Sequence, residues 1–281
     1  MTVTNNHNLP LPIFLAVQND SYDKGDCDYS ATELLIPPRA RALMREHKDE
    51  ITEDASELIF RLIGDIGHLL LERAGEGSGY VEKRFFADIA GRKVSGKADL
   101  ICLPDQGHQL IDYKFTSIYT TMDGPKREWT EQLNILAYLA KRNGVDIGSA
   151  NIVAIYRDWS KPKAAREKDY PKSQVAVLPI ELWPEDKQRE FITYRIVQHE
   201  AAKTALPLCT PEERWQTPNQ WAVKKKGNKR ATRVFDNEEQ AEAAVTFGDN
   251  MEIEFRPGES KRCECYCAAA PFCSQYLSTK I

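Results

Sequence analysis

The sequence predicts an α/β fold in which helices flank a mixed β-sheet. Apolar segments bounded by turn residues indicate strands at 80–87, 93–103, 109–115, 151–156 and 174–182. Between the third and fourth of these strands, residues 128–142 carry apolar side chains at helical spacing, and residues 186–203 form another long amphipathic stretch. Strands interleaved with helices of this length are typical of a sheet covered by helices.

Three further helices are expected before the first strand. Ser30 to Leu35 begins a short helix, Pro37 interrupts it, and Pro38 suits the first turn of a second helix that ends near His47. Residues 52–73 have strong helical periodicity. Gly64 and Gly67 lie inside it, and glycine in a helix indicates close packing or a nearby site, because it costs about 1 kcal/mol relative to alanine. Three regions are therefore predicted: an N-terminal helical segment (1–50), a core domain (51–205) and a cysteine-rich subdomain (206–281).

The composition restricts the classes of function. The chain has 281 residues, and 38 basic against 42 acidic side chains give a net charge of −4. Proteins that coat nucleic acid are usually basic overall, so any contact with DNA would depend on local patches. No apolar stretch of about 18 residues predicts a membrane-spanning helix, and we expect a cytoplasmic protein with no membrane partner. In that reducing compartment, the seven cysteines favour metal ligation over disulfides. The oligomeric state has no sequence signal.

An acidic pair and a lysine occur on two neighbouring predicted strands. Asp112 and Lys114 are two residues apart, so both project from the same face. A short turn before the third strand would place Asp99 directly opposite Asp112. Like charges facing each other are unfavourable unless a cation lies between them, and carboxylates suit Mg²⁺ or Mn²⁺. The alternative is a solvent-exposed hairpin in which Asp99 and Lys114 form an ordinary cross-strand pair.

These residues and their neighbours resemble the RecB-like branch of the PD-(D/E)XK nuclease superfamily. Gly96-Lys97-Ala98-Asp99 precedes Asp112-Tyr113-Lys114, Gln132 follows on the next helix, and Gly64-Asp65-Ile66-Gly67-His68 lies upstream. The resemblance implies a restriction-endonuclease-like core. It also implies that His68, Asp99, Asp112 and the Tyr113 carbonyl hold the metal, that Lys114 is catalytic and that Gln132 orients the substrate or the lysine.

The implied activity is divalent-metal-dependent hydrolysis of DNA, with exonuclease action on ends favoured over internal cutting. Glu82 lies on the first strand, where some family members carry another acid. Leu136 stands where the family often has tyrosine, and this departure allows an alternative: a DNA-binding recombination or replication accessory protein with a weak or lost nuclease site. A site-specific endonuclease is a third possibility, but no separate recognition domain is evident in the sequence.

The C-terminal cysteines indicate a second centre. Cys263, Cys267 and Cys273 form a Cys-x3-Cys-x5-Cys run, and Cys209 can supply a fourth thiolate. Four thiolates suit a [4Fe-4S] cluster or a structural Zn²⁺, while the alternative is a set of thiols without metal. Cys265 competes with Cys263 as a ligand, and Cys27 competes with Cys209.

This layout resembles the iron-sulfur nucleases of the AddB kind and of the CRISPR-adaptation exonucleases. It is also similar to phage-encoded nucleases with a Cys-Thr-Pro-Glu-Glu-Arg-Trp segment, here Cys209 to Trp215, which favours Cys209 and would place the protein in a host cytoplasm.

A basic hairpin is predicted between Cys209 and Cys263. Its cations, which could bind phosphates, are Lys224, Lys225, Lys226, Lys229, Arg230 and Arg233. Trp215 and Trp221 flank it and could stack on bases. The alternative is a solvated hairpin tip without a partner. Further elements are expected at 237–246, as a helix, and at 251–255, as a strand.

Overall fold

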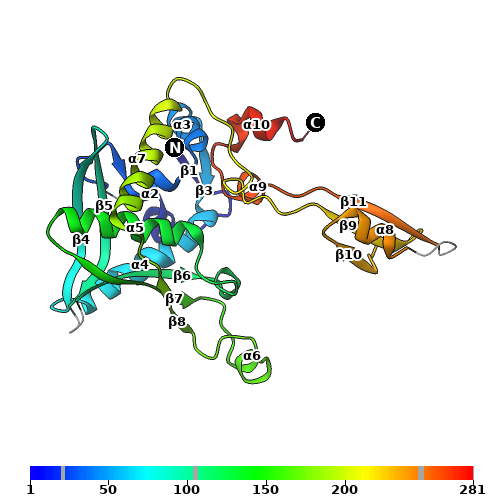
Figure 1. Cartoon of the computed structure of the whole chain (residues 1–281), viewed down its shortest axis with the longest axis horizontal. Helices are drawn as coiled ribbons and strands as arrows, with labels where there is room; N and C mark the ends of the chain where they lie inside the picture. The colour runs from blue at the N-terminus through cyan, green and yellow to red at the C-terminus, as the bar shows by residue number, and fades with distance from the viewer. Residues whose placement is uncertain (20–22, 104–106, 246–249, 281) are drawn as a thin grey trace.

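The structure is a computed structural model that describes residues 1–19, 23–103, 107–245 and 250–280. Figure 1 shows a body in which helices flank a sheet, and an arm that projects from it. The main sheet mixes parallel and antiparallel strand pairs, so the predicted α/β class is confirmed. No helix among the described residues is long and apolar enough to span a bilayer.

The five strands predicted between residues 80 and 182 all belong to the main sheet. Its strands are β2 (Tyr29–Ser30), β4 (Gly79–Ile89), β5 (Arg92–Cys102), β6 (His108–Thr116), β7 (Ile147–Tyr156) and β8 (Val175–Ile180). Their order is β2-β5-β6-β7-β8, with β4 paired to β5. The β2–β5 and β6–β7 pairs are parallel, and the β4–β5, β5–β6 and β7–β8 pairs are antiparallel. The turn predicted at 104–107 falls largely on residues 104–106, which lie outside the described residues.

The N-terminal region contains short strands besides the expected helices. It contains helices α1 (Leu11–Gln18), α2 (Ala31–Leu35) and α3 (Pro38–Glu46), and strand β1 (Thr2–Thr4) pairs in parallel with β3 (Thr52–Asp54). Strand β2 joins the main sheet, so the region is part of the core. Strands of two or three residues are too short to give a periodic signal in the sequence. The two predicted helices are confirmed, and a capping box between Ser30 and Glu33 begins α2.

The helix predicted at 52–73 begins later than expected. Residues 52–54 form β3, a 3₁₀ turn η1 covers Ala55–Leu58, and α4 spans Ile59–Ala74. Asp54 accounts for the difference because it ends the strand and caps the turn, accepting a hydrogen bond of 3.1 Å from the Ser56 amide. No residue of α4 is fully buried, and Phe60, Ile66 and Leu70 are exposed despite the apolar periodicity.

Helix α5 (Arg127–Arg142) is the central packing element of the body. Leu133, Leu136 and Leu139 are fully buried, and the helix contacts strands β4 to β7 as well as α2 and α7 (Glu185–Ala201). Gly96 of β5 allows this approach, because a Cβ there would lie only 2.5 Å from Cδ2 of Leu136. The leucine at the position of the family tyrosine is therefore a core residue. The remaining helical elements of the body are η2 (Ile118–Thr120) and α6 (Lys161–Arg166).

A gap in the pairing of β5 positions the candidate site. Strand β4 pairs along the length of one edge of β5, and β2 and β6 share the other edge. On that edge, the pairing with β2 ends at Ser95 of β5 and the pairing with β6 begins at Leu100 of β5. The observed pairs, including Leu100 with Ile111 and Cys102 with Gln109, have the register that was predicted from the turn. The ladder stops before Asp99. Residues 96–99 therefore have no strand partner on this edge among the described residues.

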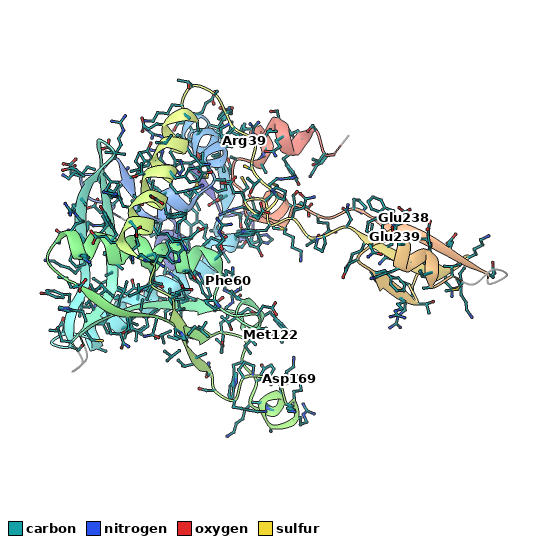
Figure 2. All side chains as sticks on the ribbon, viewed as in Figure 1. Arg39, Phe60, Met122, Asp169, Glu238 and Glu239 are labelled. Atoms are coloured by element: carbon teal, nitrogen blue, oxygen red, sulfur yellow. The ribbon has the colours of Figure 1, made fainter. Side chains whose placement is uncertain are left out.

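The arm contains the predicted basic hairpin. Strands β9 (Gln220–Lys225) and β10 (Arg233–Phe235) are antiparallel, β11 (Met251–Arg256) pairs with β9 on the other side, and helix α8 spans Glu238–Ala243. Thr246, the last residue of the helix predicted there, lies outside the described residues. A narrow neck joins the arm to the body: Gln216 bridges to Ser260, and the Thr217 amide donates to the Glu259 carbonyl at 3.0 Å. Figure 2 shows the arm extending away from the body.

The C-terminal segment returns from the arm to the body. It forms α9 (Lys261–Cys265), the 3₁₀ turn η3 (Ala270–Phe272) and α10 (Ser274–Leu277). Its Ala269, Cys273 and Tyr276 pack against Leu43 of α3 as a small apolar cluster separate from the main core.

Candidate functional sites

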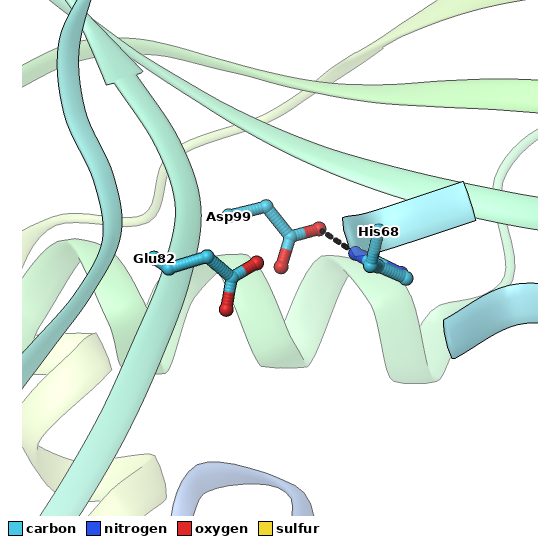
Figure 3. A group of neighbouring side chains, drawn as sticks. All are labelled: His68, Glu82 and Asp99. Atoms are coloured by element: carbon cyan, nitrogen blue, oxygen red, sulfur yellow. Dashed lines mark ion pairs between the residues drawn. The ribbon is translucent and has the colours of Figure 1, made fainter. Parts of the chain in front are cut away.

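Three side chains from three elements converge beside the gap in β5. His68 comes from α4, Glu82 from β4 and Asp99 from β5, and one ligand atom of each lies within 4.8 Å of the others. Nδ1 of His68 is 3.4 Å from Oδ2 of Asp99, and Figure 3 shows both carboxylates directed toward the same space. A search of the described residues for three or more histidine, cysteine or acidic side chains close enough to hold one metal ion finds these three.

Close packing of α4 brings His68 to the acids. A Cβ on Gly67 would collide with the ring of Phe115 on β6, so glycine is needed for the helix to lie this near the sheet. The inference that glycines here mark close packing is confirmed for Gly67. Gly64 is not closely packed, because no atom outside its own helical turn lies within 4 Å of the position that a Cβ would occupy there.

The backbone at Glu82 is in an unusual conformation. Its φ is +48°, in the left-handed region that residues other than glycine seldom adopt. The neighbouring pairs Val81–Leu100 and Lys83–Ala98 are regular, so Glu82 interrupts the ladder opposite Asp99. Such a conformation costs roughly 1–3 kcal/mol, and it persists where the surroundings hold it. Lys97 forms an ion pair with Glu82, and the cleft that these residues line has a volume of about 670 Å³.

Electrostatics at this cluster disfavour an isolated carboxylate. Burial raises the pKa of Asp99, and repulsion from the Asp112 carboxylate raises that pKa further. Burial lowers the pKa of His68, which favours the neutral imidazole, the form that ligates metals. Burial therefore disfavours the charged form of both partners in the contact between His68 and Asp99. A cation placed among these groups would offset the cost of the buried negative charge.

Asp112, Lys114 and Gln132 form a closed triangle next to the cluster. Gln132 Nε2 donates to Asp112 Oδ1 at 3.0 Å, and Lys114 Nζ donates to Gln132 Oε1 at 3.2 Å. Lys114 Nζ also lies 2.6 Å from Asp112 Oδ2. The angles of this contact do not fit a hydrogen bond. The buried Oδ2 of Asp112 therefore has an ion-pair partner but no hydrogen-bond donor among the described residues. One amide side chain thus fixes both the carboxylate and the ammonium group.

The triad differs from the metal-ligand set expected from the sequence. His68 and Asp99 lie together as expected, but Glu82 takes the third position, and Asp112 instead contacts Lys114 and Gln132. The amide of Tyr113 donates to Asp99 Oδ2 at 2.9 Å, so this residue contacts the cluster through its N–H. The alternative cross-strand pair of Asp99 with Lys114 is not formed, because Lys114 pairs with Asp112.

Four cysteines line one enclosed pocket. They are Cys209, Cys263, Cys267 and Cys273, with Ala40, Leu43, Ala269, Ala270, Gln275 and Tyr276 completing the walls. Cys265 is exposed and does not line the pocket, and Cys27 lies elsewhere, with its thiol 3.2 Å from Ser95 Oγ. The fold thus separates both competing cysteines from the set.

The side-chain amide of Gln275 ties the cysteine pocket together, and burial disfavours ionisation of three of its thiols. The Cys209 amide donates to Gln275 Oε1 at 2.8 Å, and Gln275 Nε2 donates to the Cys209 carbonyl at 2.9 Å. Burial raises the pKa of Cys209 to about 12, with further contributions from Glu213 and the other thiols of the pocket. Burial also raises the pKa values of Cys263 and Cys267. These thiols would ionise only with a positive charge beside them.

The basic side chains of the arm differ in their surroundings. Lys225, Lys226, Lys229 and Arg230 are exposed at the hairpin tip, and in the described part of the chain none of them has an acidic partner. Lys224 is different because it pairs with Glu254 at 2.5 Å and with Glu252 at 3.4 Å. Arg233 lies over the ring of Phe235, 4.8 Å from its centroid.

Trp215 is a structural anchor, so its predicted availability for base stacking is not supported. Its indole N–H donates to Glu128 of α5 at 2.9 Å, and the guanidinium of Arg262 lies 4.5 Å from the ring centroid. Its φ is +51°, an uncommon value for a bulky residue. Trp221 lies on the arm and contacts Phe255, with 5.2 Å between the ring centroids.

Sequence reasoning missed Arg39. This side chain is buried in α3, and its Nε donates to Cys273 Sγ at 3.2 Å. No local pattern distinguishes it from Arg41 or Arg45 in the same helix, because its partners come from the other end of the chain.

Comparisons with known proteins give little further information. No protein-family model matches the chain, and no curated protein matches it. Its structure is similar to a solved structure described as "Crystal structure of SSO0001", with a TM-score of 0.45 and 21% sequence identity over 63% of this chain and 79% of that chain.

Proposed function

We propose that the protein is a divalent-metal-dependent deoxyribonuclease with a PD-(D/E)XK core that acts on DNA ends. The observation that carries the proposal is the convergence of His68, Glu82 and Asp99 beside the triangle of Asp112, Lys114 and Gln132. A hard-cation site next to a partly buried lysine is a combination suited to phosphodiester hydrolysis.

The donor set fits Mg²⁺ or Mn²⁺. Two carboxylates and one neutral imidazole offer the oxygen and nitrogen ligands that these ions accept. Asp112 Oδ2 is buried and lies 2.6 Å from the Lys114 ammonium group, so this carboxylate adds negative charge beside the three donors. When bound, the ion would lower the pKa of a water molecule and offset the charge of the scissile phosphate.

Lys114 and Gln132 have distinct roles in this proposal. The Lys114 ammonium group would donate to the attacking water or to a phosphate oxygen, stabilising the negative charge that develops during the reaction. Gln132 holds that group through its Oε1 and the adjacent carboxylate through its Nε2. It would therefore act as a positioning residue, because it touches the reacting groups only through Lys114 and Asp112.

The arm would supply the contact with DNA. Its four tip cations have no acidic partner among the described residues. The arm that carries them is joined to the body by a narrow neck. They therefore form a local basic patch in a chain whose net charge is −4. Phosphate contacts at the tip would tether the strand while the cleft at Asp99 holds the scissile bond. The preference for ends rests on the resemblance of the site motifs to the RecB-like branch. A DNA-binding accessory protein is the alternative if turnover is absent.

The four-cysteine pocket would hold a structural metal centre that fastens the C-terminal segment to the body. In the described structure, no three of these sulfurs meet the 4.8 Å spacing at which the His68 cluster is found. A single zinc with Zn–S bonds of about 2.3 Å would require sulfurs about 3.8 Å apart. The resemblance of the cysteine run to iron-sulfur nucleases favours a [4Fe-4S] cluster, in which several iron atoms lie between the thiolates.

Digestion of linear DNA with purified protein and Mn²⁺ tests the nuclease proposal. Wild-type protein should degrade end-labelled linear DNA, Lys114→Ala should lower the rate by roughly 10²-fold or more, and removal of the metal by EDTA should stop the reaction. Lys93→Ala is the matched control, because Lys93 also lies on the sheet but pairs with Asp26 at the surface.

Two results would reject parts of the proposal. Equal activity of wild type and Lys114→Ala would point to a contaminating nuclease and remove the support for this site. Cleavage of covalently closed circular DNA as fast as linear DNA would exclude the requirement for an end.

A further inference from the structure

Helix α3 carries two arginines that are equally buried but differently paired. Arg39 and Arg41 are each 5% exposed. Arg41 has a conventional anionic partner: it donates to Glu33 at 3.0 Å and lies over the ring of Tyr29. Arg39 has no carboxylate within ion-pair distance among the described residues.

The hydrogen-bond acceptors of Arg39 among the described residues are two carbonyls, a hydroxyl and a sulfur, and none of them is a carboxylate. Its Nη1 donates to the carbonyls of Leu206 and Pro207 at 3.3 and 3.2 Å, and its Nη2 donates to Ser274 Oγ at 2.8 Å. Its Nε donates to Cys273 Sγ at 3.2 Å. These four bonds give each guanidinium nitrogen an acceptor, but no carboxylate neutralises the charge. Burying a charge without a counter-charge costs several kcal/mol.

The cysteine pocket is where a counter-anion for Arg39 would lie. Cys273 is one of the four cysteines that line the enclosed pocket, and Arg39 reaches its sulfur. Four thiolates around Zn²⁺, or around a [4Fe-4S]²⁺ cluster, carry a net charge of roughly −2. Either centre would make Arg39 the buried partner of an anion, just as Arg41 is the partner of Glu33.

We infer that Arg39 is the counter-ion and positioning residue of a metal centre held by Cys209, Cys263, Cys267 and Cys273. The inference rests on the part of the proposed function that assigns a metal to this pocket. It adds a residue from the other end of the chain, and it explains how α3 is joined to the C-terminal segment. The hydrogen bonds to Leu206 and Pro207 orient the segment leading to Cys209, while those to Cys273 and Ser274 orient the other side of the pocket.

Two measurable properties follow from a cation that donates to a ligand sulfur. Outer-shell donors of this kind typically change metal affinity by about 10–100-fold. In an iron-sulfur centre, a positive charge and a hydrogen bond to sulfur also stabilise the reduced state, which is the more negative one. Loss of Arg39 should therefore accelerate metal release and, for a cluster, lower the reduction potential.

The test uses the full chain purified without oxygen. Iron, acid-labile sulfide and zinc per chain are measured first, which distinguishes a cluster from zinc. Release of the metal to excess EDTA is then followed for wild type, Arg39→Gln, Arg39→Lys and Arg41→Gln. A visible-absorption redox titration is added if iron is found.

Arg39→Gln should release metal roughly 10–100-fold faster than wild type. Arg39→Lys should stay closer to wild type, because it retains the charge. Arg41→Gln should lower the melting temperature, because it removes the ion pair with Glu33, but should not change metal release. These differences would separate a role at the metal centre from a general effect of removing a buried arginine.

Several outcomes would overturn the inference, and they differ from those that reject the nuclease. If wild type holds metal and all four proteins release it at one rate, Arg39 has no role at the centre. Equal acceleration in Arg39→Lys and Arg39→Gln would show that its charge is irrelevant. If the wild-type protein contains no metal, the proposed centre does not exist and the inference fails. The nuclease proposal is tested separately, by the effect of Lys114→Ala on digestion of DNA with Mn²⁺.

Discussion

The backbone amide of Tyr113 donates to Oδ2 of Asp99 at 2.9 Å, at the point where β5 and β6 cease to pair. An aspartate side chain thus replaces a carbonyl as the acceptor for a strand amide. This hydrogen bond holds the Asp99 carboxylate across the gap between the two strands. The same oxygen lies 3.4 Å from His68, so the break in the sheet and the candidate metal site are one feature.

Asp99→Asn should separate the two roles of this side chain. The amide oxygen can still accept from Tyr113, so the melting temperature should stay near that of wild type, whereas the lost charge should weaken Mn²⁺ binding at least tenfold. Calorimetric titration with Mn²⁺ measures the second effect. Asp88→Asn on β4 provides a control. Unchanged Mn²⁺ affinity in Asp99→Asn would place the metal elsewhere.

Gln132→Ala should lower the turnover number without a matching change in affinity for DNA. The reason is that Gln132 fixes Lys114 and Asp112, and a misplacement of about 1 Å can reduce the rate roughly 10²-fold. Steady-state kinetics on linear DNA give kcat and KM separately. Gln188→Ala removes another buried glutamine, bonded to Asn134, and should leave kcat unchanged. A change confined to KM would contradict a positioning role.

The two glycines of α4 should respond in opposite ways to alanine. Gly67→Ala forces a Cβ against the Phe115 ring, so we expect the free energy of unfolding to fall by about 1–3 kcal/mol. Gly64→Ala meets no described atom within 4 Å and should raise stability by up to about 1 kcal/mol, because alanine favours the helix. Urea denaturation of both variants measures the difference. The reverse order of stabilities would contradict the observed approach of α4 to β6.

His199 should make the protein less stable in mild acid. Burial lowers its pKa from 6.5 to about 4, a direction reinforced by Arg195 and Arg41, while its hydrogen bond to the Leu34 carbonyl and the charge of Glu33 oppose the shift. Between these values the unfolded chain binds a proton that the folded chain does not, so stability falls as pH drops from about 6.5 to 4. The total loss would be about 3 kcal/mol.

Melting temperatures of wild type and His199→Gln between pH 4 and 7.5 check this dependence. The variant should lose a large part of the slope in this range, and His7→Gln, at an exposed position, should keep it. A wild-type slope retained in His199→Gln would assign the acid sensitivity to other groups.

The salt dependence of DNA binding should identify the cations that bind phosphates. Replacing Lys225, Lys226, Lys229 and Arg230 by alanine should reduce the slope of log K against log salt by roughly 0.7 for each phosphate that these side chains neutralise on single strands. Lys224→Ala should change the slope little, because Glu254 already pairs with that lysine. Fluorescence anisotropy with a labelled oligonucleotide and Ca²⁺ in place of Mn²⁺ gives the slopes. Identical slopes in wild type and the fourfold variant would remove the arm from the DNA interface.

Local patterns were sufficient to predict the strands β4 to β8, the long helices and the register of β5 against β6. Apolar runs and turn residues act over a few positions, so the sequence displays them directly. The short strands β1 to β3 and the late start of α4 were not predictable, because their partners lie far away in the chain. The same limit applied to the candidate site: Asp99, Asp112 and Lys114 were proposed from spacing, whereas the proximity of Glu82 to His68 and Asp99 is visible only in the folded chain.

The sequence by itself determined the chemical inventory: two acids and a lysine on adjacent strands, a histidine on a glycine-containing helix and a set of C-terminal cysteines. Only the tertiary structure decided which of them meet. It excluded Cys27 and Cys265 from the pocket, and it brought buried Arg39 to Cys273 across 234 positions of the chain. The physical reason is that a charge or a ligand acts over a few ångströms of space, and chain folding alone decides which distant residues come within that range.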